Sequence, residues 1–263
     1  MRATDFPFFD TGFAAIAHRG GAEHPDLVGK ENSLAAFQHA VDMGYRYLET
    51  DVHATRDGVL VAFHDDSLDR VTDSSGPLVE LAYADLQRAR IGGTEPVPRL
   101  DDLLEAFPEA RFNLDLKHPN AVTPLVRAIE RHRAQDRVCV ASFSMERIRA
   151  FRRLMGRRVP TCVSPAGALW NAYVPLLPRL LNSPGVAFQV PLRHPVLGRE
   201  VRVVTRRLLK HAHAAGKVVH AWTINDEQLV HDLIDLGLDG VFTDRTDTVK
   251  KVLQERGLWE GGR

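Results

Sequence analysis

Residues 45–53 have the sequence YRYLETDVH, and this segment decides which fold the chain adopts. Aromatic and β-branched residues fit a pleated surface, and no glycine or proline interrupts them, so the segment predicts a β-strand. Successive side chains of a strand point to opposite faces, which places Glu49 and Asp51 on one face, about 7 Å apart. Two carboxylates on an apolar strand are costly to bury unless a cation lies between them. We therefore expect a hard divalent cation with oxygen ligands, Mg²⁺ or Ca²⁺, beside this strand.

The length and charge of the chain narrow the class of protein. The 263 residues are 44% apolar and 26% charged, which suits one globular domain covering residues 1–263. The 34 basic residues balance the 34 acidic ones, so no net charge attracts the chain to nucleic acid or to an anionic membrane. The expected partner is therefore a small molecule.

The sequence also predicts the cellular compartment of the protein. Residues 1–11 lack the features of a signal peptide, and no apolar run reaches the ~18 residues of a membrane span. The two cysteines, Cys139 and Cys162, lie in or at the end of apolar strand-like segments. Buried free thiols are typical of a reducing compartment, so a cytoplasmic protein without a transmembrane segment is expected. The sequence does not predict an oligomeric state.

Strand-like and helix-like segments alternate along most of the chain. Eight principal strands are expected near residues 14, 48, 113, 139, 160, 188, 219 and 241. Helices are expected over residues 34–44, 100–106, 122–133, 145–155, 202–215, 226–236 and 246–256. Eight β/α units in this length predict an α/β fold, a (β/α)₈ TIM barrel. A doubly wound open sheet is the alternative, but no GxGxxG motif follows the first strand.

Two segments depart from this alternation. Residues 66–99 contain several turn-forming pairs around one short helical piece at 84–89. Because the segment contains too few apolar residues for a core, it predicts a small loop insertion after the second strand region. The apolar stretch 166–181 has two interpretations: it covers the fifth strand as a helix or turn, or it forms a lip that admits lipid-like substrates.

Polar residues gather where the predicted strands end, which is where barrel enzymes carry their active sites. Asp115 and Lys117 share one face of the strand 111–117, as Glu49 and Asp51 do on theirs. Glu49, Asp51 and Asp115 would together offer three oxygen ligands to a divalent cation. Any one of these carboxylates could instead make a structural ion pair, but three on one barrel face favour a metal site.

His18 and His64 each follow an apolar run and precede a turn. A single histidine in such a place is usually structural, but imidazole titrates near neutral pH, so a pair beside a metal predicts general acid–base catalysis. Arg19, Lys117 and the cation would form a cationic clamp for a phosphate. Zinc with histidine ligands is the alternative, although three carboxylates favour a harder ion.

An ordered series of motifs spans residues 13–256 and resembles the glycerophosphodiester phosphodiesterase family. The motifs are His18-Arg19-Gly20, Glu31-Asn32-Ser33, Glu49-Thr50-Asp51, Asp57-Gly58, His64-Asp65, the run from Leu68 to Asp73 followed by Gly76, Asn113 to Lys117, Ser142-Phe143, Trp222 to Asn225 and Thr243-Asp244-Arg245. The resemblance implies a barrel with a small insertion after His64. It also implies hydrolysis of glycerophosphodiesters to glycerol 3-phosphate and an alcohol such as choline or ethanolamine.

The resemblance also assigns roles to residues. It implies that His18 and His64 are the acid–base pair and that Arg19 contacts the phosphate. It implies that the metal ligands are Glu49, Asp51 and Asp115. Lys117 would pair with the phosphate, and Trp222 would pack against the glycerol or alcohol group or simply fill the barrel rim. Members of this family usually carry glutamate at the third ligand position, so Asp115, with its shorter side chain, is a departure.

The expected mechanism is metal-assisted phosphodiester cleavage, with His18 as the base and His64 as the acid. The nucleophile is either water or a neighbouring glycerol hydroxyl, and the second would pass through a cyclic phosphate. The sequence is also compatible with two alternatives. The chain could act on lysolipids as a lysophospholipase D, or it could be a barrel that binds phosphate esters without turnover.

Overall fold

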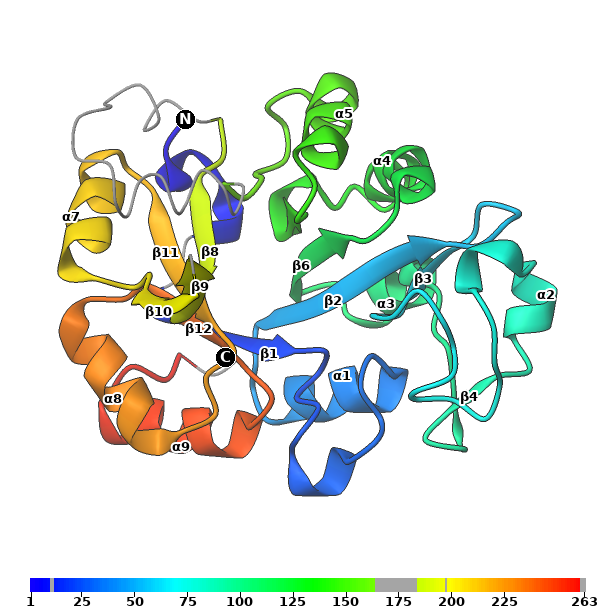
Figure 1. The fold of residues 1–263 in the computed structure, drawn as a ribbon, viewed down its shortest axis with the longest axis horizontal. Coiled ribbons are helices and arrows are strands. Elements are labelled where there is room, and N and C mark those ends of the chain that lie inside the picture. Colours follow the sequence, from blue (N-terminus) through cyan, green and yellow to red (C-terminus); the bar gives the residue numbers. More distant parts are fainter. Residues whose placement is uncertain (10–11, 164–183, 197, 261–263) are drawn as a thin grey trace.

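The computed structural model describes residues 1–9, 12–163, 184–196 and 198–260 (Figure 1). The segment 166–181, for which the sequence left two interpretations, lies outside the described residues. In the described part of the chain, no helix is both long enough and apolar enough to cross a membrane.

Parallel strands form the centre of the molecule, in the order β7-β6-β2-β1-β12-β11-β8. These strands are β1 (Ala14–His18), β2 (Tyr47–Ala54), β6 (Arg111–Leu116), β7 (Val138–Ala141), β8 (Ala187–Pro191), β11 (Val218–Trp222) and β12 (Gly240–Thr243). Between β7 and β8, Thr161 bridges to Val140 and Cys162 bridges to Ala187, both in parallel. This short segment occupies the place of the expected fifth strand and closes the ring, so the predicted (β/α)₈ barrel is confirmed.

Helices surround the strands (Figure 1). They are α1 (Leu34–Asp42), α3 (Leu100–Ala106), α4 (Val122–Arg131), α5 (Met145–Met155), α7 (Arg206–Ala214), α8 (Glu227–Leu236) and α9 (Thr246–Glu255). Each buries a stripe of side chains three to four positions apart, as Leu125 and Ile129 do on α4, and the main core lies between this layer and the sheet. Short 3₁₀ turns complete the connections: η1 (Ala3–Asp5), η2 (Pro7–Phe9), η3 (Pro25–Leu27), η5 (Pro119–Ala121) and η6 (Gln135–Arg137).

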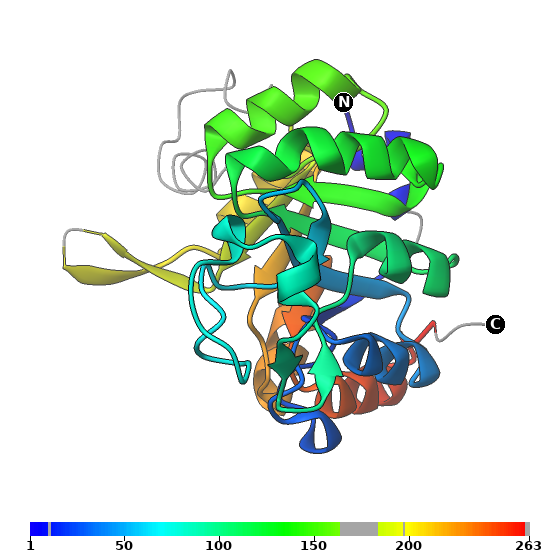
Figure 2. The ribbon, with the colours of Figure 1, turned by 90° about the vertical axis from the view of Figure 1, so that its right-hand side faces the viewer.

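An antiparallel hairpin precedes α7, where the sequence predicted a helix over residues 202–215. Strands β9 (Arg193–Val196) and β10 (Arg199–Arg202) pair with each other, and the hairpin projects from the body of the molecule (Figure 2). The helix begins only at Arg206, because the Thr205 side chain accepts a hydrogen bond from Leu208 N and caps it. The expected start at residue 202 was therefore wrong.

The insertion after β2 has a core of its own. Strand β3 (Leu60–Ala62) pairs antiparallel with β2 and leads into η4 (Leu78–Glu80), α2 (Tyr83–Leu86), β4 (Arg90–Ile91) and β5 (Glu95–Pro96). Buried apolar side chains form a separate cluster here: Val61, Phe63, Leu68, Leu78, Leu86, Ala89, Ile91 and Val97. The expectation that this segment lacks enough apolar residues for a core was wrong, because six of its own apolar side chains pack together with Val61 of β3 and with Phe63.

The interior of the barrel is apolar at the end where the strands begin. Phe8 of η2 packs edge-on against Tyr47, whose hydroxyl donates a hydrogen bond to Phe8 O at 2.7 Å. Ile16 and Phe242 lie beside each other on β1 and β12 and continue this apolar layer. The polar residues of the strands therefore lie further along, toward the ends of the strands.

Candidate active site

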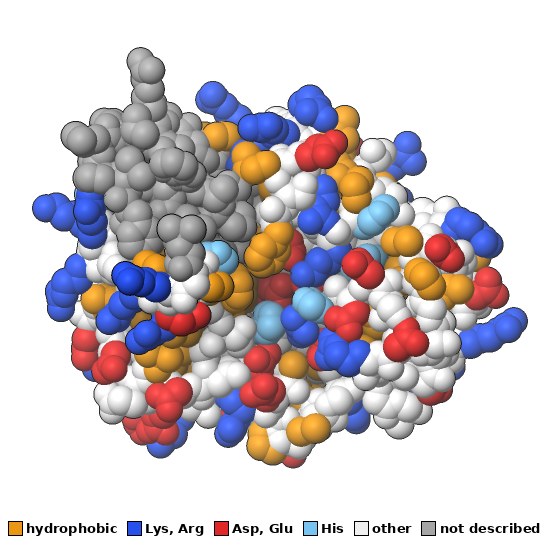
Figure 3. Space-filling view, in the orientation of Figure 1, with side chains coloured by type: hydrophobic (Ala, Val, Ile, Leu, Met, Phe, Trp, Pro, Cys, Tyr) orange, Lys and Arg blue, Asp and Glu red, His pale blue; other side chains and the backbone are white. Residues whose placement is uncertain are grey.

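A cavity of about 300 Å³ opens at the carboxyl ends of the barrel strands. Figure 3 shows it as a recess near the centre of the face, with acidic side chains inside and basic and histidine side chains around them. All the site residues expected from the sequence line it: His18, Arg19, Glu49, Asp51, His64, Asp115, Lys117 and Trp222. The fold thus brings together residues as distant in the chain as His18 and Trp222.

Strand register explains this convergence. His18 on β1 lies opposite Glu49 on β2, and Asp51 on β2 lies opposite Asp115 on β6. Since residues two apart share a face, these pairs form two successive rows of inward-facing side chains. The third acidic residue thus comes from the strand beside β2, as the same-face argument required.

The three carboxylates are buried, with Glu49, Asp51 and Asp115 exposed by only 5%, 2% and 6%. Burial, together with the neighbouring charge of Asp51, raises the pKa of Glu49 to about 7. Burial also acts to raise the pKa of Asp51, but the cations of Lys117 and Arg19 outweigh it and lower that pKa. The three buried carboxylates therefore create a negative potential that favours the binding of a cation.

Lys117 is the cation that meets this charge in the structure. Its Nζ lies 2.8 Å from Asp51 Oδ1 and 2.9 Å from Asp115 Oδ2. The other oxygen of Asp115, Oδ1, is buried and has no hydrogen-bond partner among the described residues. An unsatisfied buried carboxylate oxygen beside a second carboxylate of raised pKa fits a hard, oxygen-loving divalent ion. The donor set is thus compatible with the metal that the sequence predicted.

Arg19 is held over the carboxylates by an unusual backbone. Its φ angle of 51° is left-handed, which costs a non-glycine residue free energy and is often found at functional sites. In this conformation its backbone N–H donates to Glu49 Oε2 at 3.1 Å, and its Nη1 donates to Glu31 Oε1 at 3.0 Å. Gly20 follows at φ 85°, where a Cβ would lie 2.8 Å from the Cβ of Ala36. The turn after β1 therefore requires glycine and fixes the guanidinium.

His18 is oriented by a carboxylate from the last strand of the barrel. Its Nδ1 lies 2.7 Å from Asp244 Oδ1, and Asn225 Nδ2 donates to the other oxygen of Asp244 at 3.2 Å. The remaining nitrogen, Nε2, lies 3.8 Å from Glu49 Oε2. Burial lowers the pKa of His18, but Glu49 and Asp244 outweigh it, so the pKa is raised overall.

His64 has a carboxylate partner as well, supplied by the insertion. Its Nδ1 lies 2.5 Å from Asp65 Oδ1, and Arg70 Nε donates to Asp65 Oδ2 at 2.6 Å. Arg70 also donates to both oxygens of Glu31, at 2.7 and 2.9 Å, and Glu31 in turn accepts from Arg19. The hydrogen bonds of Arg70 lower the pKa of Asp65 to about 2. One continuous network thus joins His64 to the arginine of the first loop.

Sequence reasoning assigned no role to several residues of this network. They are Glu31, Asn32, Asp65, Arg70, Asn225 and Asp244. All of them belong to the motifs of the ordered series, and that was the signal that could have identified them. Asn32 has a left-handed φ of 59°, and its side chain accepts from Thr50 at 2.7 Å and donates to Asp51 at 3.4 Å. Strand periodicity could not identify these residues, because they act through contacts between loops.

His53 shares the face of Glu49 and Asp51 but makes a different contact. Its side chain is fully buried, and its Nε2 lies 3.3 Å from the backbone oxygen of His64. Burial lowers its pKa, so the neutral ring is favoured. His53 therefore supports the loop that carries His64.

The cavity also has an apolar side. Trp222 at the end of β11 meets Phe143 edge-on, with ring centroids 5.9 Å apart. Lys117 Nζ lies 5.8 Å from the centre of the Phe143 ring, so this aromatic pair borders the charged cluster. Phe143 is 60% exposed, which is unusual for a large apolar side chain.

Fold and site together define a (β/α)₈-barrel hydrolase of phosphoric diesters, with two carboxylate-oriented histidines beside a cationic and acidic cluster. The chain belongs to the glycerophosphoryl diester phosphodiesterase family, whose model matches residues 18–248. The match begins at His18 and includes every residue of the cavity that the sequence predicted.

Known proteins resemble the chain over most of its length. It is 40% identical to the probable glycerophosphodiester phosphodiesterase 2 of Mycobacterium tuberculosis, covering 95% of this chain and 94% of that protein. It is 28% identical to a human lysophospholipase D, covering 87% and 82%. A phosphodiesterase structure from Oleispira antarctica, in complex with the product sn-glycerol-3-phosphate, superposes with a TM-score of 0.77 at 25% identity, covering 92% and 97%.

Proposed function

We propose that this chain hydrolyses glycerophosphodiesters to glycerol 3-phosphate and an alcohol, with His18 and His64 as the acid–base pair. The observation that carries the proposal is that each histidine is oriented by a carboxylate, Asp244 or Asp65, and that both histidines line one cavity. A carboxylate at Nδ1 fixes the ring and its tautomer and leaves Nε2 for proton transfer. A protein that only binds phosphate esters has no need of two such pairs.

In this mechanism His18 removes a proton from the nucleophile and His64 protonates the leaving alcohol oxygen. Each transfer is effective because the two rings are held in place before the substrate arrives. Asp244 stabilises the charge that His18 gains when it accepts the proton, and Asp65 does the same for protonated His64. Arg70 lies on the far side of Asp65 and keeps that carboxylate ionised.

Arg19 and Lys117 are the groups that would bind the phosphate. Both side chains are largely buried at the cavity, with exposures of 18% and 17%, so their charges act in a poorly solvated environment. Their fixed positions suit the negative charge that develops on the non-bridging oxygens during cleavage. A divalent cation, Mg²⁺ or Ca²⁺, held by Glu49, Asp51 and Asp115 would supply further neutralisation of this charge.

The proposal is tested by glycerol 3-phosphate release from glycerophosphocholine in the variants His18→Ala and His64→Ala. General acid–base catalysis contributes ~10²- to 10⁴-fold, so each variant should lose at least ~100-fold in kcat. His213→Ala is the matched control, because His213 also pairs with an aspartate, Asp239, at 2.8 Å but lies on the surface. Activity within about threefold of wild type in both cavity variants would contradict the assignment.

A second candidate activity, lysophospholipase D, is favoured by the aromatic side of the cavity. Phe143 and Trp222 present apolar surface next to the charged cluster, where a leaving group or an acyl chain could lie. Comparing kcat/KM for glycerophosphocholine and lysophosphatidylcholine separates the two activities. A strong preference for the lysolipid, lost in Phe143→Ala, would replace the first assignment.

We propose that the protein is located in the cytoplasm, and its two thiols support this proposal because buried free thiols are typical of a reducing compartment. Cys139 and Cys162 are both buried and free, with their sulfur atoms 3.8 Å apart. Burial raises the pKa of the Cys162 thiol well above its ordinary value, so the reactive thiolate is disfavoured. Fractionation of the native cells, followed by immunoblotting, tests the placement.

A further inference from the structure

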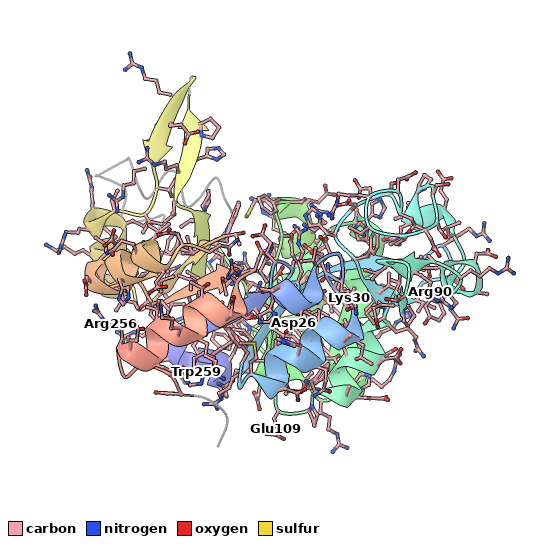
Figure 4. The ribbon with its side chains drawn as sticks, turned by 90° about the horizontal axis from the view of Figure 1, so that it is seen from below. Asp26, Lys30, Arg90, Glu109, Arg256 and Trp259 are labelled. Carbon is pink, nitrogen blue, oxygen red and sulfur yellow. The ribbon has the colours of Figure 1, made fainter. Side chains whose placement is uncertain are left out.

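A second group of potential metal ligands lies outside the cavity, on the loop that joins β1 to α1. His24 precedes η3, Asp26 lies within it, and His39 faces them from α1. Figure 4 shows Asp26 beside this helix. We propose that His24, Asp26 and His39 form a binding site for a transition-metal ion of the zinc type, separate from the catalytic cluster. The proposal does not depend on the proposed function.

The distances fit such an ion. Asp26 Oδ2 lies 3.7 Å from His24 Nδ1 and 3.8 Å from His39 Nε2. Zinc bonds of about 2.0–2.2 Å in a tetrahedron place neighbouring ligand atoms about 3.4 Å apart. The two pairs that include Asp26 must therefore approach by only a few tenths of an ångström, which side-chain rotation in an exposed aspartate can supply, and all three ligand atoms lie within 4.8 Å of one another. Three protein ligands would leave the fourth position for water.

The chemistry of the three groups also fits. Imidazole and carboxylate together suit zinc and its neighbours in the first transition series, whereas Mg²⁺ and Ca²⁺ prefer oxygen alone. Neither ring nitrogen of His39 makes a hydrogen bond within the described chain, and Nδ1 is buried. His24 Nδ1 accepts a long hydrogen bond of 3.2 Å from Asp26 N, and a bound ion would replace this N–H as the partner of the Nδ1 lone pair.

The arrangement of the two rings gives a further reason. Their centroids are only 4.3 Å apart, so two protonated imidazoles would repel each other strongly at this distance. A metal ion uses the neutral form of both rings and turns the repulsive pair into a joint ligand. The pair is thus better suited to hold a cation than to carry two protons.

Another group of potential metal ligands in the molecule is less suited to an ion than His24, Asp26 and His39. In the described part of the chain, Glu227, His231 and Glu255 form the other such group outside the cavity. There, Lys251 Nζ already lies 2.8 Å from Glu227 and 3.9 Å from Glu255, so an ammonium neutralises the carboxylates. The ion pairs of Asp26, by contrast, run to the two histidines.

The ion would act as a structural link rather than as a catalyst. It would join the loop that contains Arg19 and Glu31 to helix α1, which follows that loop in the chain. A bound ion that favours the folded state raises its stability by mass action. We therefore expect Zn²⁺ to raise Tm and to order the loop beside the cavity.

The experiment is a Co²⁺ titration of the chelator-treated full chain, followed by the visible absorption band of four-coordinate cobalt. The variants are Asp26→Asn, His39→Gln, Asp51→Asn in the catalytic cluster and His231→Gln as the matched surface control. Loss of a supporting group alone weakens metal sites 10- to 100-fold, so Asp26→Asn and His39→Gln should weaken Co²⁺ binding by at least ~10-fold. Asp51→Asn and His231→Gln should leave the band and its affinity unchanged.

A second readout uses Zn²⁺ and needs no activity measurement. At about a hundredfold excess over Kd, Zn²⁺ should raise the Tm of wild type by roughly 5 °C and leave that of Asp26→Asn unchanged. Asp26 is exposed, so this variant should fold normally. The proposal is overturned if His39→Gln and Asp26→Asn bind Co²⁺ as tightly as wild type, or if the band disappears in Asp51→Asn instead.

Discussion

His18 Nδ1 lies 2.7 Å from Asp244 Oδ1, although the two residues are 226 positions apart in the chain. Closure of the barrel brings them together, because β1 and β12 are neighbours in the ring. Asn225 fixes the aspartate from a third strand end, by accepting from Asp244 N at 2.9 Å and donating to its Oδ2. The proposed catalytic base is therefore oriented by the same ring closure that defines the fold.

The variant Asp244→Asn tests this orientation. An amide can present an N–H to His18 Nδ1, which would favour the wrong tautomer and remove the charge that stabilises a protonated ring. We expect kcat to fall by ~100-fold or more, with a smaller change in KM, since proton transfer is affected before substrate binding. Asp235→Asn is the control, because Asp235 pairs with Arg256 on the surface. An unchanged kcat would exclude Asp244 as a positioning residue.

Removing Arg70 should separate catalytic from structural effects. Arg70 is 48% exposed, so its ion pairs should contribute no more than about 1 kcal/mol to the free energy of unfolding. Yet it holds both Asp65 and Glu31, and through them His64 and Arg19. We expect Arg70→Ala to lower kcat by about tenfold with Tm nearly unchanged, whereas the exposed Arg131→Ala should alter neither. A fall in Tm proportional to the lost activity would indicate a structural role instead.

Asp115 tests how the carboxylate cluster holds its ion. Its Oδ1 is buried and has no hydrogen-bond partner in the part of the chain that the structure describes, and its side chain is shorter than the glutamate that the family resemblance implies. We expect Asp115→Glu to lower the Mg²⁺ concentration for half-maximal activity, because the longer side chain reaches further into the cavity. Asp115→Asn should raise that concentration by at least ~10-fold, since it removes a charged oxygen ligand. Mg²⁺ titrations after chelation provide the measurement, and identical curves for all three proteins would remove Asp115 from the ligand set.

The sequence predicted the barrel because regular apolar runs, such as β1 and β7, bury both faces of their strands. It failed where structure depends on contacts between distant segments. The fifth strand, which was expected near residue 160, is reduced to bridges at Thr161 and Cys162. The hairpin 193–202 carries several arginines and a proline, so its composition gave no strand pattern. In the insertion, apolar residues spaced widely along the chain form a core only once β3 is added.

The same distinction holds for the candidate site. Glu49, Asp51 and Asp115 could be predicted because a strand places alternate residues on one face, and register then aligns neighbouring strands. The contacts of Asp65 and Asp244 could not, because nothing in local periodicity tells which loop meets which. Motif order identified these residues, but only the fold shows which histidine each one orients.

His220 should make the protein sensitive to acid. The ring is buried inside the barrel between Phe9 and Phe242, and burial lowers its pKa to about 4. The unfolded chain takes up a proton near pH 6.5 but the folded chain does not, so stability falls as the pH drops from 6.5 toward 4. Near pH 5 the loss amounts to about 2 kcal/mol, at ~1.4 kcal/mol per pH unit. His220→Phe keeps an aromatic ring at this position but cannot take up a proton. Between pH 7 and 5, the free energy of unfolding of this variant, measured in urea, should fall less than that of wild type. Equal losses would contradict the assignment.

The contribution of the insertion's core to stability can be measured by truncating Leu86. Its side chain is fully buried in the cluster formed with Val61 and Ile91, so Leu86→Ala should leave a cavity and lower the free energy of unfolding by about 2–4 kcal/mol. Leu154, which is 50% exposed on α5, provides the control, and Leu154→Ala should cost about 0.5 kcal/mol or less. Urea unfolding measures both values. If Leu86→Ala lowered the free energy of unfolding as little as the control does, the insertion would be a loose loop. Arg70 would then have no rigid support from which to hold Asp65 and His64.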